Sequence, residues 1–219
     1  MSLGTILLIL AGLLVLFGVG QRVLDRLRLT DRQAIVWIAL IIAGGLLPDI
    51  SVTPYFSFNI GGALIPLALC VWLFLKADTT VERVRSIAAA MLTAVAVFLL
   101  GRMLPSEPES MTLDPTYVYG LAAGAIAYVL GRSRRCAFIA GVVGVMLAQT
   151  ASWIMVNRLG AGQRLSLGGA GGYDVVVIAG LVAVLLAELV GEILERMKRG
   201  RQRPTREFKN GDFVRRDQP

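Results

Sequence analysis

Seven apolar blocks, each roughly 15 to 21 residues long, constrain this chain more than any other feature of its sequence. An α-helix needs about 20 apolar residues to cross the roughly 30 Å of hydrocarbon in a bilayer, so blocks of this length predict membrane spans. The second and fifth blocks are short, and six spans with one re-entrant hairpin are the alternative. The blocks lie at about residues 3–19, 34–48, 60–76, 86–104, 117–131, 136–156 and 174–194.

The composition supports the same interpretation. Hydrophobic residues make up 56% of the 219 residues and charged residues only 17%. A soluble domain of this size would need an implausibly large core to bury so much apolar surface. We therefore expect an all-α, polytopic transmembrane bundle over residues 1–199, followed by a basic tail over residues 200–219 that lacks regular structure.

The basic residues alternate from loop to loop. All but three of the 22 Lys and Arg lie in every second connection or in the tail, and the exceptions are Arg102, Arg158 and Arg164. Cytoplasmic loops of membrane proteins are enriched in Lys and Arg, so the N-terminus is expected outside and the tail inside, in a prokaryotic cell (inner) membrane. The first block is preceded by no positive charge and followed by Arg22 and Arg26, which favours an uncleaved span over a signal peptide. The net charge of +7 thus predicts orientation and contact with membrane lipids, anionic headgroups at the tail included, and no nucleic-acid partner.

Two outer segments end alike. Residues 59–63 read Asn-Ile-Gly-Gly-Ala and open the third block, and residues 166–170 read Ser-Leu-Gly-Gly-Ala and lead into the seventh. The likeness is consistent with a parallel repeat of spans one to three and five to seven, and coincidence in a Gly- and Ala-rich chain is the alternative.

These glycine segments predict a binding site. Glycine at the start of a membrane helix lets backbone N–H groups approach a ligand where the helix dipole favours negative charge, while close helix packing is the competing explanation. Arg158 and Arg164 would supply countercharge for an anion or a lipid phosphate. The predicted ligand-binding residues are Asn59, Gly61, Gly62, Arg158, Arg164, Ser166, Gly168, Gly169, Gly171 and Asp174.

The acidic residues allow a different hypothesis. Asp49 and Asp174 both lie at outer helix ends, and two acids at one membrane depth are what an intramembrane aspartyl protease needs. The simpler interpretation of each is a turn or helix-capping residue. Glu188 lies within the seventh block about 21 Å along the helix from Asp174, where an ionisable side chain predicts either an ion path or an interhelical hydrogen bond. Polar residues of the sixth block, Gln149 and Ser152 among them, are expected to face the seventh span.

Several classes of catalytic and metal site are excluded because the chain lacks the residues that they need. The chain has no histidine, which excludes Ser-His and Cys-His nucleophile pairs and histidine-ligated zinc or haem. No phosphate-binding loop ending in Gly-Lys-Ser/Thr is present, and we expect neither a cofactor nor a metal. Cys70 and Cys136 are expected to be free thiols.

Three stretches carry a family resemblance: residues 21–27, residues 59–67 and residues 168–174. Through them the chain resembles a bacterial and archaeal family of integral membrane proteins of unknown function. The resemblance implies a membrane fold with characteristic outer motifs and no particular activity. In the family pattern a glycine follows the last aspartate and another aspartate lies in the sixth span, whereas this chain has Val175 and Thr150 there.

Together these observations favour a membrane protein without catalytic residues that binds or transports a small anionic or lipidic ligand at the outer ends of spans three and seven. The alternatives are the Asp49–Asp174 protease and a structural subunit with protein partners in the membrane.

Overall fold

The computed structural model describes residues 3–17, 27, 29–103, 115–131, 133–160, 162–169, 172–201, 206–209 and 212–215. The chain divides into two units, Met1–Ala187 and Glu188–Pro219, which are considered separately. The first unit holds the helical bundle and every residue of the candidate site described below.

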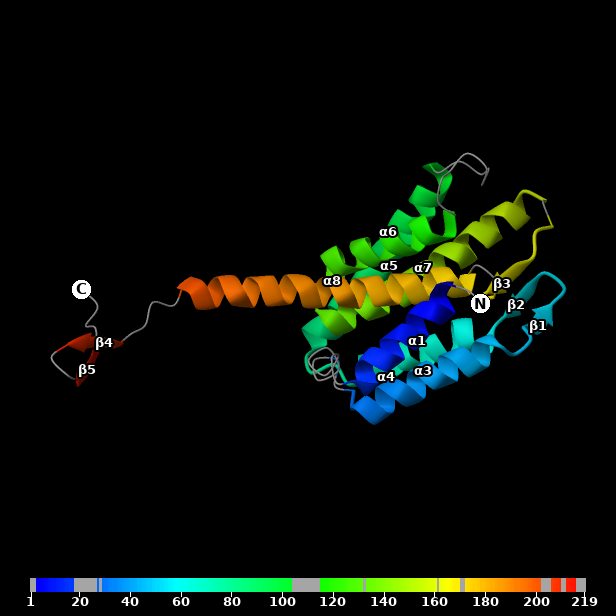
Figure 1. Ribbon diagram of the computed structural model, residues 1–219. Coiled ribbons are helices and arrows are strands. Elements are labelled where there is room, and N and C mark those ends of the chain that lie inside the picture. Colours follow the sequence, from blue (N-terminus) through cyan, green and yellow to red (C-terminus); the bar gives the residue numbers. More distant parts are fainter. Residues whose placement is uncertain are drawn as a thin grey trace. The chain divides into compact units, whose positions relative to one another are not determined.

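The bundle is built from α-helices, as the apolar blocks predict (Figure 1). Each block coincides with helical structure, and the third block begins with a five-residue π-helix, η1, that runs directly into α4. The helices are α1 (Leu3–Leu16), α3 (Asp31–Gly45), η1 (Ile60–Leu64), α4 (Ile65–Leu75), α5 (Thr80–Met103), α6 (Pro115–Gly131), α7 (Arg134–Arg158) and α8 (Gly172–Arg201).

Within the described residues, three segments are long and apolar enough to cross a membrane, namely Thr80–Met103, Arg134–Arg158 and Tyr173–Ile193. Leu3–Leu16, Ile60–Leu75 and Tyr117–Gly131 are shorter apolar helices. The all-α bundle is therefore confirmed and its long apolar helices are consistent with a membrane protein, while the seven spans and their orientation stay predictions.

Local sequence signals explain where several helices begin. Thr30 caps α3 in a reciprocal capping box with Gln33, and Ser133 caps α7 by accepting a hydrogen bond from the Cys136 amide. Pro66 stands at the start of α4 and has no N–H to donate back into the preceding turn. The π-helical turn lies immediately before this proline, where the regular α-helical hydrogen-bond pattern is interrupted.

Small residues allow the helices to pack closely. The Cα of Gly124 on α6 faces Val182 and Ala179 of α8, and Gly144 on α7 faces Thr93 of α5.

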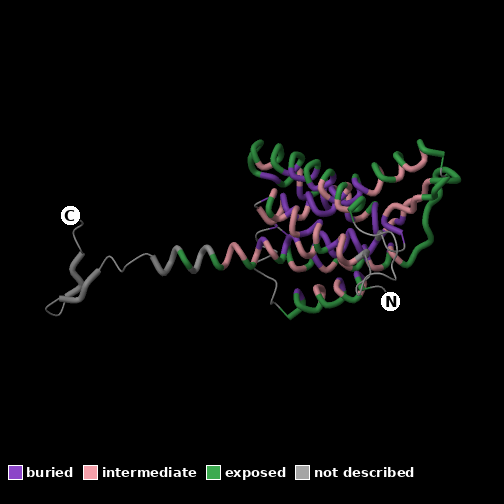
Figure 2. Tube along the Cα trace, turned by 90° about the horizontal axis from the view of Figure 1, so that it is seen from above, coloured by how far each residue is buried: buried purple, intermediate pink, exposed green. Residues whose placement is uncertain are grey.

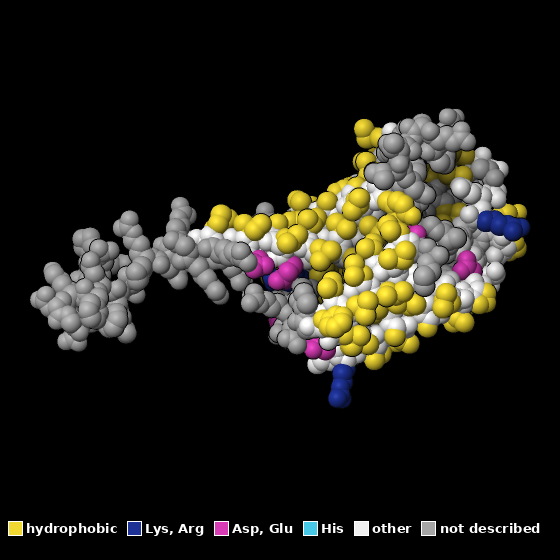
Figure 3. Space-filling view, viewed as in Figure 1, with side chains coloured by type: hydrophobic (Ala, Val, Ile, Leu, Met, Phe, Trp, Pro, Cys, Tyr) yellow, Lys and Arg dark blue, Asp and Glu magenta, His cyan; other side chains and the backbone are white. Residues whose placement is uncertain are grey.

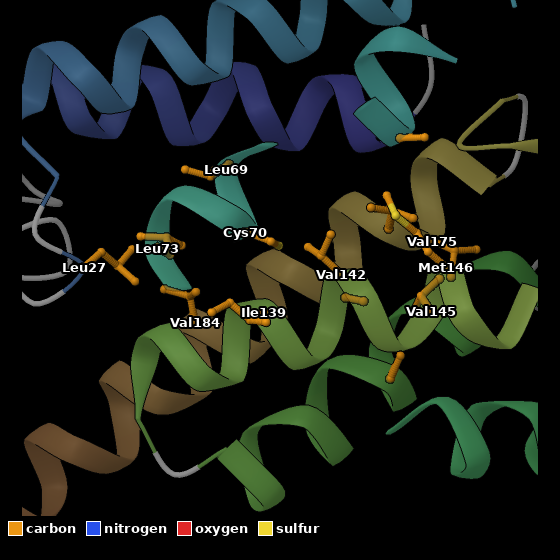
Figure 4. Close-up of a cluster of buried hydrophobic side chains, with 14 of the residues drawn as sticks. Leu27, Leu69, Cys70, Leu73, Ile139, Val142, Val145, Met146, Val175 and Val184 are labelled. Atoms are coloured by element: carbon orange, nitrogen blue, oxygen red, sulfur yellow. The ribbon is translucent and has the colours of Figure 1, made fainter. Parts of the chain in front are cut away.

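The largest buried cluster lies between α4, α7 and α8, with Leu73, Ile139 and Val142 among its members (Figure 4). Buried residues lie on the inward sides of the helices, and exposed side chains on the outward sides are largely apolar (Figures 2 and 3). An apolar exterior is what a membrane-embedded bundle requires.

A small sheet joins two segments far apart in the sequence. Its strands are β1 (Ile50–Thr53), β2 (Phe56–Phe58) and β3 (Leu165–Leu167), in the order β1-β2-β3. β1 and β2 form an antiparallel hairpin, and β2 pairs in parallel with β3, Ser57 opposite Ser166. The sequence analysis did not predict these strands. We call the end of the bundle that carries them the sheet end (Figure 1).

The second unit contains the last part of α8 and a hairpin of β4 (Arg206–Lys209) and β5 (Asp212–Arg215). The sequence analysis expected residues 200–219 to lack regular structure, and here the structure differs.

The close packing of Gly124 leads to a prediction. In Gly124→Ala the new Cβ would lie 2.6 Å from the Val182 Cβ, so α6 and α8 must separate. We expect a loss of about 1–3 kcal/mol, seen as a lower midpoint of thermal unfolding in detergent.

Gly12→Ala is the matched control. Its Cβ would meet the Ile38 side chain at 3.6 Å, an ordinary contact. Because alanine favours a helix over glycine by about 1 kcal/mol, the control should unfold at the same or a higher temperature. Equal destabilisation by both substitutions would contradict the packing described here.

Candidate functional site

Asn59 is the most highly connected polar residue of the sheet end. Its side chain is only 5% exposed. The Oδ1 atom accepts a hydrogen bond from the Gly62 amide at 2.9 Å and so caps η1. The Nδ2 group donates to the Leu47 carbonyl at 3.1 Å and to Asp49 Oδ1 at 2.9 Å. Its backbone N–H donates to the Leu167 carbonyl of β3 at 2.9 Å. One residue therefore ties the end of α3, the start of η1 and β3 together.

Asp49 completes this polar cluster. Its second oxygen, Oδ2, accepts a hydrogen bond from the Ser166 hydroxyl, so the carboxylate links the turn after α3 to β3. Asp49 is exposed at the surface, whereas the neighbouring Gly169 is buried. A Cβ on Gly169 would lie 1.9 Å from Ser166 Oγ and 2.8 Å from Asp49 Oδ2. Only glycine leaves room for this cluster.

The predicted glycine ligands lie where two backbones meet. A Cβ on Gly62 would lie 1.9 Å from the Gly168 carbonyl oxygen, and Gly168 has φ +66°, which favours glycine. A Cβ on Gly61 would lie 2.0 Å from the Gly45 nitrogen on α3. The geometry thus accounts for these glycines by close packing, the competing explanation given above. Their role in binding a ligand stays a prediction.

Asp174 holds a different element. It is 7% exposed, and its Oδ1 accepts a hydrogen bond from the Gly4 amide at 3.1 Å. Gly4 lies in the first turn of α1, where backbone N–H groups have no partner within the helix. The neighbouring ring of Tyr173 packs close to Gly4 and Gly45. Asp174 and Tyr173 therefore fasten α1 and α3 to the start of α8.

The two candidate protease aspartates are held by separate partners. Asp49 is bonded to Asn59 and Ser166, and Asp174 to the backbone of α1. Each carboxylate has a structural role of its own, and the aspartyl-protease hypothesis stays a prediction.

A cavity of about 770 Å³ opens beside this polar cluster. Its walls come from the ends of α5 and α7 nearest the sheet, from the first turns of α6 and α8 and from the segment that leads into β3. Val97, Val145 and Val175 give it an apolar wall, and Arg102, Gln149 and Arg164 are its main polar residues. Volumes of roughly 300–1,000 Å³ are typical of small-molecule sites.

Both arginines of the cavity are exposed. The Arg102 guanidinium lies 4.9 Å from the centre of the Phe98 ring and contacts the Met155 sulfur. Among the described residues, no acidic side chain lines the cavity and none pairs with either arginine. The cavity therefore carries two positive charges that these residues leave unbalanced.

The segment before β3 fixes the backbone at Arg164. The carbonyl of the preceding residue, Gln163, accepts hydrogen bonds from Trp153 Nε1 at 2.9 Å and Asn157 Nδ2 at 3.0 Å, both on α7. On the other side, the Leu165 amide donates to the Tyr55 carbonyl at 3.0 Å. The Arg164 backbone is thus held between α7 and the β1–β2 hairpin.

Gln149 has an unusual environment. Its Oε1 atom is buried and accepts no hydrogen bond from the described residues. A buried amide oxygen without a donor costs about 1–3 kcal/mol, so such groups in native structures call for an explanation. In a cavity wall, the amide is available to a bound molecule.

The remaining predicted residues fall outside this arrangement. Arg158 is exposed at the last residue of α7, and Gly171 lies outside the described residues. Glu188 belongs to the second unit and has an interaction partner. Thr150, where the family pattern has an acid, donates its hydroxyl to the Met146 carbonyl of its own helix at 2.8 Å. Of the predicted ligand-binding residues, Arg164 lines the cavity.

The Asn59 network leads to a second prediction. Asn59→Asp keeps the acceptor for Gly62, removes both donated hydrogen bonds and sets a second carboxylate against Asp49. We expect a loss of about 2–3 kcal/mol in unfolding free energy and faster amide exchange in β2 and β3.

The double variant Asp49→Asn with Asn59→Asp tests the cause. It exchanges the amide and the carboxylate, which removes the repulsion and restores one donor–acceptor pair. Part of the lost stability should return. A double variant no more stable than Asn59→Asp would contradict the proposed pairing.

Comparisons with known proteins place the chain in a family and assign no activity. No curated protein and no solved structure matches the chain. One family profile, described as a protein of unknown function, matches residues 24–186, which include α3 to α7, the sheet and the start of α8. Since this match covers most of the sequence, the chain belongs to the DUF1614 family.

Proposed function

We propose that this protein is an integral membrane protein that binds a small anionic or lipidic ligand at the extracytoplasmic side of a prokaryotic cell (inner) membrane. The ligand occupies the cavity between α5, α6 and α7. Of the two helix ends favoured from the sequence, the start of α8 contributes Val175 to the cavity wall, and η1 contributes no lining residue.

One observation carries the proposal. The alternation of basic loops leaves three arginines for the outer side, and two of them, Arg102 and Arg164, line the same cavity. Arginines on the outer side run against the usual charge bias of membrane proteins. A ligand with negative charge supplies the partner that the described residues do not.

The rest of the wall supports an organic ligand. Apolar and aromatic residues with a few convergent polar groups are the usual lining of small-molecule sites. Trp153 and Tyr119 add aromatic surface, and Gln149 and Ser152 add polar groups from α7. The backbone bonds around Arg164 fix the main chain that carries one cation before any ligand binds.

Retention of lipids tests the proposal. The protein is extracted from native membranes in a nonionic detergent, and the lipids that stay bound are identified by native mass spectrometry. We expect anionic species to be enriched over zwitterionic species with the same chains. Arg102→Gln and Arg164→Gln should each reduce that enrichment at least about threefold, since each removes charge-assisted bonds of about 1.5 kcal/mol or more.

Arg158→Gln is the matched control, because Arg158 is also an exposed outer arginine but does not line the cavity. It should retain the lipids of the unsubstituted protein. An equal loss of anionic lipid in all three variants would mean a diffuse charge effect. No loss in any variant would mean that the cavity does not bind the lipid.

A further inference from the structure

We infer that the cavity selects an amphiphile with one hydrocarbon chain and an anionic phosphate or carboxylate head, held head outward. The head lies between Arg102 and Arg164, and the first part of the chain lies against Val97, Val145 and Val175. The inference rests on the proposed function and names its ligand class.

The order of residues along α7 gives the cavity a direction. Its lining runs from Val145 to Val156, which is about 16 Å of helix at about 1.5 Å per residue. Val145 and Ala148, farthest from the sheet end, are buried, while Ser152 is exposed. The cavity wall therefore changes from buried to exposed along α7, and its polar side chains on this helix, Gln149 and Ser152, follow the buried Val145 and Ala148.

The other walls follow the same order. On α5 the lining begins with buried Val97 and ends with Arg102, and Arg164 lies on the segment that leads into the sheet. Both cations thus lie toward the sheet end, and Val145, Val97 and Val175 form the opposite, apolar part. An anionic head fits the part with the two cations, and a hydrocarbon chain fits the apolar part. A lipid in the outer leaflet has the same orientation.

The volume favours one chain. A water molecule takes up about 30 Å³ in the liquid, so 770 Å³ holds on the order of 25 groups of that size. That is room for a head group and one chain. A bare anion would leave the apolar wall without contacts, which is unfavourable in a close-packed interior.

A chain-length series tests the inference. The full-length protein is held in a nonionic amphipol, so that no micelles compete for the chain, and binding is measured by calorimetry. The probes are inorganic phosphate and butyl, octyl, dodecyl and hexadecyl phosphate, with dodecyltrimethylammonium as the amphiphile of opposite charge.

We expect affinity to rise at least tenfold from butyl to octyl phosphate, since each buried methylene contributes up to about fourfold. It should change little from dodecyl to hexadecyl phosphate, because the apolar wall ends at Val145. The cationic amphiphile should bind at least tenfold more weakly than dodecyl phosphate, and Arg102→Gln should reduce that difference.

A pair of variants on α7 probes the chain alone. Ala148→Phe places a large side chain in the apolar part of the cavity, whereas Leu147→Phe adds bulk at an exposed position outside the lining. Ala148→Phe should lower the affinity for dodecyl phosphate at least fivefold and leave the affinity for inorganic phosphate unchanged. Leu147→Phe should change neither affinity. The chain-length series on the unsubstituted protein decides the matter if Ala148→Phe does not fold.

The outcomes separate the inference from the proposed function. If inorganic phosphate binds as tightly as dodecyl phosphate and depends on Arg102 and Arg164, the site is for a small anion and the inference is wrong. If cationic and anionic amphiphiles bind equally, the cavity is an unselective apolar crevice, and both statements fail. Both also fail if no anion binds in an arginine-dependent way.

Discussion

The side-chain amide of Asn59 is the interaction on which the sheet end depends. It caps η1 through Gly62 and holds the turn after α3 through Leu47 and Asp49, while its backbone bonds to β3. β3 in turn follows Arg164, whose neighbours are bonded to α7 and to the β1–β2 hairpin. A buried polar group that satisfies all its hydrogen bonds permits few alternative arrangements. The position of one cavity arginine is thus linked, through continuous backbone, to the residue that organises the helix ends.

Glycine makes this organisation compact. Where Gly62 meets Gly168 and Gly61 meets Gly45, backbone lies against backbone with no space for a Cβ. Farther along the bundle, Gly144 meets Thr93 and brings α7 close to α5. Toward the sheet end the same two helices present larger side chains, Phe98 and Trp153 among them, and the cavity opens there. Small residues at one level and large ones at the next explain why close packing and a cavity occur between the same two helices.

The helices could be predicted from the sequence, and the site only in part. Long apolar blocks carry a strong local signal, and each one lies on a helix. β2 and β3 have three residues each, too few to show an alternating pattern, and their pairing depends on contacts more than a hundred residues apart. Adjacent glycines at a helix start look the same in the sequence whether they face a ligand or another backbone. Here the structure favours packing, because a Cβ on Gly62 would lie 1.9 Å from the Gly168 carbonyl oxygen. The cavity draws on five separate segments, so no motif marks it. The available signal was the pair of outer arginines, Arg102 and Arg164.

Photoaffinity labelling in native membranes tests the central claim most directly, that an anionic amphiphile occupies this cavity. The probe is a single-chain alkyl phosphate with a diazirine in its chain, and labelled residues are mapped by mass spectrometry. The account predicts labels on cavity residues such as Val145 and Ala148, prevented by excess dodecyl phosphate. Labels spread over exposed faces such as Leu92 and Val95, unaffected by the competitor, would contradict it.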